Sequence, residues 1–465
     1  MKKKLYRIIA IALCMVSTLC FSGCSCMMLA VVVDEMLDNE VNERTTEEST
    51  EKVSQDQTMS ANPLVTTDKS KATVLIYMNG SDLETDEGQA TEDITEMIEA
   101  SYSEDVNVLI QTMGTRIWDD KYDIASYETQ RFQVMENDLE LVEDGLGQLD
   151  CTSYETLRDF IKWGADEYPA ERYILILWNH GGGPVYGFGY DEFQSYNDSL
   201  TLDEMQKALK ESEVSFDFIG MDCCIMSCLE VCYALYDYCD YMILSEEFES
   251  GIGWSYCGWL NELARNPEIS TQELAVTLID DMISDNEAST DEASTLALID
   301  QSMVKVLYRT WQEFAYANEE TLLNYNFSME IEGSGRKLPK LAMKGIFDDD
   351  YEEGIADYYI TDIMAVAKNV DSKEAEALSK VLDKTILYFR ATDDVKYLSG
   401  LAVTLPYGDS DYYYDLKEVF TECGFDSEYV DWLEKFTNAS GVSDYYDYES
   451  GFNWEDMFDW DIWGY

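Results

Sequence analysis

Short apolar runs alternate with amphipathic stretches through residues 72–265. The apolar runs occupy residues 73–78, 106–112, 173–178, 216–220 and 241–244. Continuous apolar runs of this length are typical of strands that are buried on both faces of a parallel sheet. The intervening stretches, of which residues 202–212 are the clearest, have helical spacing. This alternation predicts an α/β fold with a mostly parallel sheet and helices on both faces.

The pattern changes in the second half of the chain. Residues 122–134 predict a two-strand excursion, and residues 270–390 predict mainly helices with an irregular acidic insert near 347–357. A late apolar run at 401–405 is expected to return to the sheet. We therefore treat residues 72–437 as one domain with helical C-terminal additions.

Both ends of the chain differ from this domain. Residues 1–23 combine Lys2, Lys3, Lys4 and Arg7 with an apolar stretch, and end in Ser22-Gly23 before Cys24. This arrangement resembles a bacterial lipoprotein signal peptide, so Cys24 is the expected lipidation site. The alternative is an uncleaved anchor, although the apolar stretch is shorter than the about 20 residues that span a membrane. Residues 34–71 are polar and acidic, and we expect residues 24–71 to form a flexible tether at the bacterial cell surface, outside the cytoplasm.

The tail, residues 438–465, interleaves aromatic with acidic residues. Three interpretations stay open. The tail packs on the domain as an aromatic layer, it binds a partner or glycan through its aromatic side chains, or it is a disordered acidic segment that occupies the substrate cleft.

The charge of the chain restricts its partners. There are 94 acidic and 31 basic residues, for a formal net charge of −63. Such a surface excludes nucleic acid as a partner, repels anionic membranes unless a lipid anchor holds the protein there, and attracts cationic peptides. Carboxylates also suit calcium, but no twelve-residue calcium loop is present, so calcium stays an expectation without assigned ligands. We expect a monomer.

The single histidine, His180, follows directly on the apolar run 173–178 and precedes three glycines. Ligands of α/β proteins bind at the carboxyl ends of parallel strands, and imidazole is the natural general base near neutral pH. Glycines there allow close backbone approach to a ligand. The alternative is a turn histidine without a role.

A second candidate follows the apolar run that ends near Met221. Asp222-Cys223-Cys224 lies between this strand and a stretch with helical character. We expect Cys224 near a helix amino terminus, which lowers the pKa of a thiol. Histidine and cysteine at the ends of neighbouring strands suit thiolate attack on an amide carbonyl, with the amides of Gly181 and Cys224 as oxyanion donors.

The ordered set of strand, His180-Gly181-Gly182-Gly183, strand and Gly220-x-Asp222-x-Cys224 resembles the clostripain-like cysteine peptidases, which are related to caspases and gingipains. Further similar segments are residues 72–84, 106–114, 241–254 and 399–407. The resemblance implies a caspase-like sandwich and an endopeptidase. It implies His180 as base, Cys224 as nucleophile and Gly181 as oxyanion donor.

The resemblance also implies specificity. Asp222 matches an acid that lines the primary pocket of members that cleave after arginine, and a buried carboxylate pairs bidentately with guanidinium. Glu246, Glu247 and Glu249 follow the next strand and add negative potential, and we assign Glu249 to substrate binding. The alternative for Asp222 is a helix cap.

Two departures from the family pattern affect these assignments. Cys223 replaces a small residue, so it stays an alternative nucleophile. Residues 181–201 hold no Lys or Arg, which argues against self-cleavage in that loop. We predict a cysteine endopeptidase that cleaves peptides and proteins after Arg, and less readily Lys, without a cofactor for the chemistry. The alternatives are a non-catalytic surface lipoprotein that binds cationic peptides or glycans, and an acyl-transfer enzyme that uses the same thioester.

Overall fold

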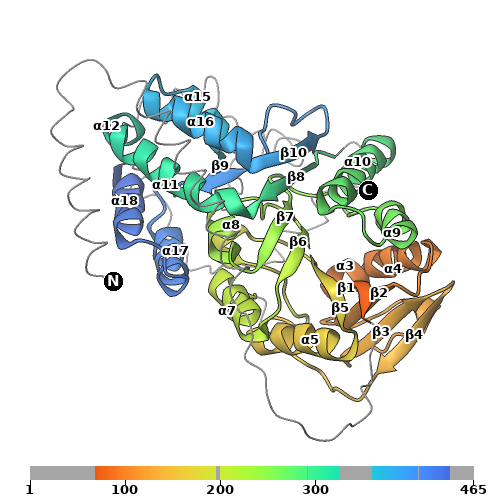
Figure 1. Ribbon diagram of the computed structural model, residues 1–465. Coiled ribbons are helices and arrows are strands. Elements are labelled where there is room, and N and C mark those ends of the chain that lie inside the picture. The colour runs from red at the N-terminus through yellow and green to blue at the C-terminus, as the bar shows by residue number, and fades with distance from the viewer. Residues whose placement is uncertain (1–68, 195–198, 291, 325–358, 407, 440–465) are drawn as a thin grey trace, which may run out of the picture. The chain divides into compact units, whose positions relative to one another are not determined.

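A central mixed sheet organises the computed structural model, which describes residues 69–194, 199–290, 292–324, 359–406 and 408–439 (Figure 1). Within these residues the sheet has nine strands. In spatial order they are β10 (Ile386–Ala391), β8 (Thr295–Asp300), β7 (Cys239–Leu244), β6 (Phe216–Asp222), β5 (Ala170–Trp178), β1 (Ser70–Asn79), β2 (Val106–Met113), β3 (Gln130–Met135) and β4 (Asp138–Glu143).

The five strands predicted from apolar runs form the parallel centre of this sheet. β1 pairs in parallel with β2 and β5, β5 with β6, and β6 with β7. Their central residues are almost all buried because helices cover both faces of the sheet. The prediction of an α/β fold with a mostly parallel sheet is therefore confirmed.

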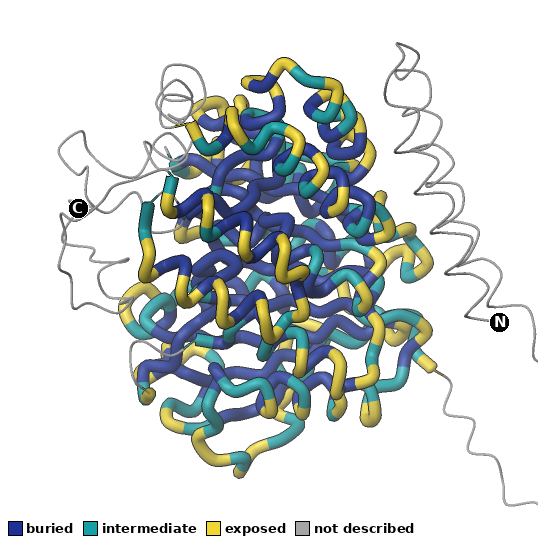
Figure 2. The backbone as a smooth tube through the Cα atoms, turned by 90° about the vertical axis from the view of Figure 1, so that its left-hand side faces the viewer, coloured by how far each residue is buried: buried dark blue, intermediate teal, exposed yellow. Residues whose placement is uncertain are grey.

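Helices form one layer on each face of the sheet, and the buried backbone in Figure 2 runs between them. Burial of apolar side chains between sheet and helices is the main stabilising term of such a fold. One layer contains α4 (Gln89–Glu99), α9 (Tyr256–Arg265) and α10 (Thr271–Ser289), whose apolar side chains share a core with the central strands. The other contains α5 (Tyr154–Glu167), α7 (Leu202–Ser212), α8 (Leu229–Leu235) and α11 (Gln301–Ala317).

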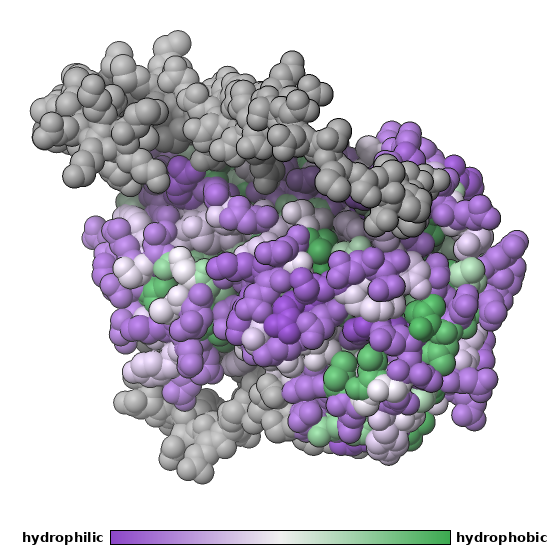
Figure 3. Space-filling model, turned by 60° about the horizontal axis from the view of Figure 1, so that its bottom comes forward, coloured by the Kyte–Doolittle hydropathy of each residue, from purple (hydrophilic) through white to green (hydrophobic). Residues whose placement is uncertain are grey.

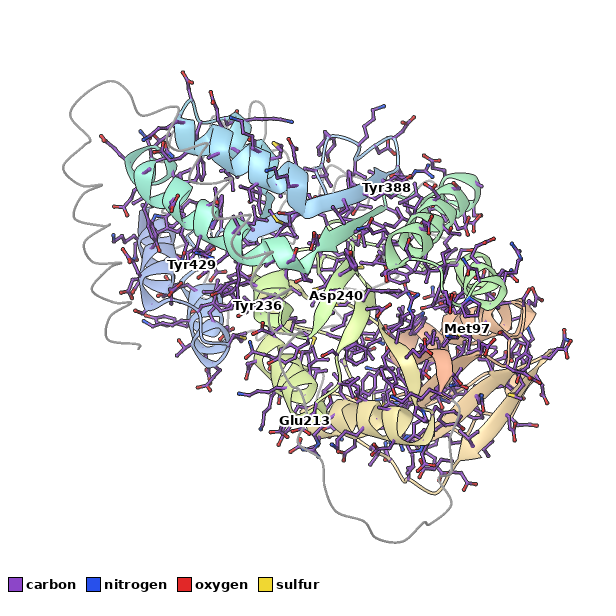
Figure 4. The ribbon with its side chains drawn as sticks, in the orientation of Figure 1. Met97, Glu213, Tyr236, Asp240, Tyr388 and Tyr429 are labelled. Carbon is purple, nitrogen blue, oxygen red and sulfur yellow. The ribbon has the colours of Figure 1, made fainter. Side chains whose placement is uncertain are left out.

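The remaining elements are short connections and C-terminal helices. Figure 4 marks the first helical layer with Met97 of α4 and the C-terminal helices with Tyr429 of α18. These elements are α3 (Ser81–Thr85), η1 (Asp120–Tyr122), α6 (Gly183–Tyr186), α12 (Glu319–Leu322), α15 (Ile363–Lys368), α16 (Lys373–Thr385), α17 (Ser410–Glu422) and α18 (Ser427–Ala439).

The structure corrects three expectations. The two-strand excursion is β3 and β4, which extends further along the chain than residues 122–134. The region 270–390 contributes two sheet strands, β8 and β10, besides its helices. The late strand β11 (Ala402–Thr404) does not return to the sheet, because it pairs with β9 (Ile360–Asp362) in a separate two-stranded sheet.

Several predictions lie outside the described residues. They concern residues 1–23 with Cys24, nearly all of the tether and tail, and the acidic insert at 347–357. Across the part that is described, no helix is both long and apolar enough to span a membrane. The face in Figure 3 is mainly hydrophilic and carries a few apolar areas, consistent with the acidic composition.

Candidate active site

His180 and Cys224 occupy equivalent positions beyond two neighbouring parallel strands. Trp178 of β5 pairs with Asp222 of β6, and each candidate residue follows two positions later. A Cβ atom at Gly181 would lie 2.0 Å from the Cys224 carbonyl oxygen. The two turns therefore touch, and only glycine permits that approach.

His180 is held by a carboxylate that the sequence analysis did not single out. Its Nε2 atom donates to Asp82 Oδ1 at 2.8 Å, and its ring stacks on Tyr190 with a centroid separation of 5.8 Å. Burial of Asp82 opposes ionisation, but the His180 interaction and hydrogen bonds from Ser81 and Tyr190 outweigh it and lower the pKa of Asp82. An ionised partner on Nε2 leaves Nδ1 as the ring nitrogen that can exchange a proton.

Buried amides fix the backbone around this pair. Asn179 Nδ2 donates to Ser81 Oγ at 2.7 Å and to the Asn79 carbonyl, while Asn79 Nδ2 donates to the Tyr190 carbonyl at 2.8 Å. Ser81 has a φ of 43°, in the left-handed region that non-glycine residues rarely adopt. Such backbone strain persists only where its surroundings enforce it, as the amide network does here.

The Cys224 thiol does not lie at a helix terminus. Helix α8 begins at Leu229, and Cys224 lies in the turn before it, so the predicted dipole effect on the thiol is wrong. Burial raises the pKa of the Cys224 thiol, against a hydrogen bond from the Glu249 amide to Sγ at 3.3 Å. Burial therefore disfavours the thiolate, and a nearby base would help to form it.

Two backbone features of the cysteine turn suit an oxyanion site. Within the described part of the chain, the Gly181 amide donates to no protein acceptor. Ile225, next to Cys224, has a φ of 51°, and its amide is already bound to the Glu247 carbonyl at 3.0 Å. The amides of Gly181 and Cys224 are thus the candidates for a developing oxyanion, and that of Ile225 is not.

Near Cys224, three carboxyls interact with one another and form a group that we call the acidic pocket: Asp93 of α4, Asp222 of β6 and Glu249 of the loop after β7. Trp178 Nε1 donates to Asp93 at 2.6 Å, the Tyr256 hydroxyl to Asp222 at 2.7 Å and Trp254 Nε1 to Glu249 at 3.3 Å. No Lys, Arg or His of the described residues lies within ion-pair distance of any of the three.

The acidic pocket lacks a positive charge, and its protonation equilibria reflect this. Burial raises the pKa of Asp222 to about 7, against hydrogen bonds from Tyr256 and Glu249. Burial and the charge of Asp222 raise the pKa values of Asp93 and Glu249 well above their usual range. One Glu249 oxygen is buried without a hydrogen-bond partner. A cation that enters this pocket would find carboxylate oxygens ready to accept hydrogen bonds.

Gly253 places no side chain over the acidic pocket. Gly253 has a φ of 58°, and a Cβ atom there would lie 3.4 Å from Asp222 Oδ1 and 3.6 Å from Asp93 Oδ2. A larger side chain would be strained and would stand over both carboxyls. The indole of Trp254, which donates to Glu249, packs against Gly220 so closely that a Cβ there would lie 2.6 Å from it.

The structure separates the three glutamates that follow β7. Glu249 joins the acidic pocket, whereas Glu246 accepts from the Gly400 amide at 2.7 Å and Glu247 from the Phe248 amide at 2.9 Å. The last two side chains are fully or almost fully buried, and these contacts hold the backbone in place. Burial raises the pKa values of both carboxyls well above their usual range, which opposes the negative potential predicted for them.

Three cysteines that follow Cys224 along the chain lie in the core. Cys228, Cys232 and Cys239 are buried, and burial raises the pKa values of Cys228 and Cys232. Cys223 is buried beside the acidic pocket, where burial and the Glu249 charge raise its pKa. The described residues contain no cluster of three His, Cys, Asp or Glu side chains that could hold a metal ion.

Sequence analysis found the histidine, the cysteine, Gly181, Asp222 and Glu249, and the structure gathers them at one edge of the sheet. It missed Asp82, Asp93 and Tyr256. Asp82 lies in the acidic stretch after the first strand, where a carboxylate beyond a strand adjacent to that of His180 was a usable signal. Asp93 and Tyr256 lie on helices, and nothing in their local sequence distinguishes them from other polar helix residues.

Comparisons with known proteins give a consistent answer. The family model described as the clostripain family, Peptidase C11, matches residues 76–460. A secreted C11 cysteine protease from Bacteroides thetaiotaomicron, solved with an irreversible peptide inhibitor, is 16% identical with a TM-score of 0.55, and the match covers 77% of this chain and 100% of that one. An inactive zymogen C11 protease from Parabacteroides distasonis is 20% identical with a TM-score of 0.54, covering 79% and 98%. No curated protein sequence matches the chain.

Proposed function

We propose, since the chain belongs to the clostripain family of cysteine peptidases, that it is an endopeptidase that cleaves after Arg and less readily after Lys. The observation that carries the specificity is the acidic pocket, with three buried carboxyls and no cation of the described chain beside them. A guanidinium group is the side chain best able to satisfy several carboxylate oxygens at once. Lysine offers only a single point charge.

Cys224 and His180 would carry the covalent chemistry. His180 takes the thiol proton, and Sγ attacks the carbonyl carbon of the substrate, whose oxygen is bound by the amides of Gly181 and Cys224. The proton then passes from His180 to the amine nitrogen as the C–N bond breaks, which leaves a thioester. Water attacks the thioester, gives one proton through His180 to Sγ, and releases the carboxylic acid.

Asp82 would act as a positioning residue for His180. Its carboxylate fixes one ring orientation and stabilises the imidazolium that forms when the thiol proton arrives. This assistance is important because burial of the Cys224 thiol disfavours the thiolate. The chemistry uses no cofactor, and calcium would act only on the structure.

Binding of the substrate cation and ionisation of the acidic pocket would be coupled. An arginine side chain favours ionised Asp222, whose pKa in the free protein is about 7, so binding releases protons near neutral pH. Substrate affinity then rises with pH through this range. The acidic surface steers cationic peptides to the site. We place the enzyme outside the cytoplasm as a monomeric lipoprotein anchored through Cys24.

The test compares peptides that differ only in Arg, Lys, Ala or Asp before the scissile bond, under reducing conditions with and without calcium. Parent, Cys224→Ala and Cys223→Ala are measured together. Arg-selective cleavage that is lost only in Cys224→Ala supports the proposal, and loss only in Cys223→Ala would reassign the nucleophile. A folded parent that binds Arg peptides without cleaving them would favour the non-catalytic alternative. Transfer products with added amines would identify the acyl-transfer alternative.

A further inference from the structure

We propose that Ile117, Tyr127 and Phe193, which we call the apolar lip, bind an apolar side chain on the leaving-group side of the scissile bond. The inference rests on the proposed peptidase function and adds a second determinant of specificity to it. Ile117 is 60% exposed and Tyr127 is 64% exposed. Among the large hydrophobic residues of the described chain, only Tyr414 has a higher exposed fraction. Exposed apolar groups that gather beside a site are candidates for ligand contact.

The apolar lip is one cluster although its members come from three segments. The rings of Tyr127 and Phe193 lie 5.0 Å apart between centroids. The Trp118 amide donates to Ser126 Oγ at 3.1 Å, which brings the neighbours of Ile117 and Tyr127 together. The segments after β2 and after α6 that carry the three apolar side chains therefore lie together.

A buried carboxyl ties the apolar lip to the helix that carries Asp82. Glu192, next to Phe193, accepts from the Arg116 amide at 2.7 Å and from Thr85 Oγ1 at 2.5 Å. The Ile117 amide donates to the same Thr85 hydroxyl at 3.3 Å. Thr85 lies one helical turn beyond Asp82 in α3, about 5 Å away along the axis. The lip is thus fixed to the element that positions His180.

The order of strands decides which part of the substrate reaches the lip. The acidic pocket and Cys224 lie at β6 and the loop after β7, His180 at β5, Asp82 beyond β1 and Ile117 beyond β2. The acyl part of the substrate stays on Cys224, with its basic side chain in the acidic pocket. His180 protonates the departing amine, so the substrate residues after the scissile bond lie next to His180. From there they extend towards Asp82 and the apolar lip.

The backbone conformation of Tyr127 places its ring at the surface. Its φ is 64°, in the left-handed region that is costly for an aromatic residue. The turn at residues 126–128 nevertheless holds the ring outward against Phe193. Ile252, which is 40% exposed in the loop beside the acidic pocket, lies on the other side of the catalytic pair and serves as a matched control.

The test uses peptides with Arg before the scissile bond and Phe, Leu, Gly or Asp among the two residues after it. We expect the parent to prefer Phe or Leu over Gly by about tenfold in kcat/KM, the effect of a modest apolar pocket. Ile117→Ser and Tyr127→Ser should each remove most of that preference, whereas Ile252→Ser should keep it. All four proteins should hydrolyse a common arginyl ester at the same rate, because its leaving group does not reach the lip.

A second readout is independent of peptide cleavage. The thioester partitions between water and an added amine, and Phe-amide should capture it more efficiently than Gly-amide only while the lip is intact. The inference is overturned if the parent shows no preference for Phe or Leu after the scissile bond, or if this preference persists in both lip variants. Either result is compatible with the proposed peptidase function. If the parent cleaves nothing, binding of a Phe-initiated peptide to parent and Ile117→Ser decides: equal affinity refutes the lip.

Discussion

Replacing Asp222 by Asn tests the acidic pocket with the smallest change in shape. The amide keeps an oxygen that can accept from the Tyr256 hydroxyl, which now lies 2.7 Å from the carboxylate, so the fold around β6 should persist. What disappears is the charge that would pair with arginine. The neighbouring carboxyls Asp93 and Glu249 have raised pKa values, so they replace the lost negative charge only in part.

The magnitude follows from the burial of the site. Asp222 is 5% exposed, so its pair with a guanidinium would be shielded from water. Breaking one partner of a buried pair costs about 3–5 kcal/mol, which corresponds to a loss of about 150- to 5,000-fold in kcat/KM at about 1.4 kcal/mol per tenfold. Cleavage after a neutral residue gains nothing from Asp222 and should change by no more than about threefold.

The assay is the ratio of kcat/KM for an Arg peptide to that for its citrulline counterpart, measured from pH 6 to pH 8. Citrulline keeps the shape without the charge, and the ratio cancels pH effects that are common to both substrates. In the parent the ratio should rise with pH, because Asp222 with its pKa of about 7 ionises in this range. In Asp222→Asn the ratio should be low and nearly flat.

The matched control is Glu230→Gln, which removes another fully buried carboxyl whose pKa is raised to about 7, on α8 away from the acidic pocket. This variant should keep the parent ratio. An Asp222→Asn protein that is folded and still prefers Arg over citrulline to the parent's extent would show that Asp222 does not bind the substrate cation.

Three further predictions follow from other contacts. Asp82→Asn should lower kcat by about 10²- to 10⁴-fold with little change in KM, because His180 loses its ionised partner; an unchanged kcat in steady-state assays would contradict this. Gly181→Ala should abolish activity or folding, because the new Cβ would lie 2.0 Å from the Cys224 carbonyl oxygen. Circular dichroism and peptide cleavage measure the two effects, and a variant that is both folded and active would show that the two turns do not touch. Burial raises the pKa of Glu230 from 4.5 to about 7, so its contribution to stability is present below about pH 4.5 and is lost as pH rises through 7. Glu230→Gln should therefore remove about 3 kcal/mol from the pH dependence of the unfolding free energy, measured by chemical unfolding. The same pH dependence of the unfolding free energy in parent and variant would disprove this prediction.

The parallel centre of the fold was predictable because strands buried on both faces leave continuous apolar runs. β10 was not, because its residues are only partly buried or exposed and therefore lack such a run. The apolar run of β11 was found but misplaced, since the bonds from its amides go to Glu230 and the loop after β6, which no local pattern shows. Pairing between distant segments is decided by tertiary contacts.

The candidate site divides in the same way. His180, Cys224 and Asp222 follow strands at their carboxyl ends, so strand prediction alone brought them to one edge. Asp93 and the Asp82–His180 contact depend on how α4 and α3 pack over that edge. The error over the Cys224 thiol has a single cause: the helix begins at Leu229, later than its residue pattern indicates, so burial dominates the thiol.

Covalent capture of the nucleophile tests directly whether Cys224 attacks substrates that carry Arg before the scissile bond. The full protein is treated under reducing conditions with a peptidyl acyloxymethyl ketone that ends in Arg, and with the matched reagent that ends in Ala, and the labelled residue is located by peptide mass spectrometry. We expect one label per chain, on Cys224 and from the Arg reagent, and none in Cys224→Ala. Label on Cys223, or equal labelling by both reagents, would contradict it.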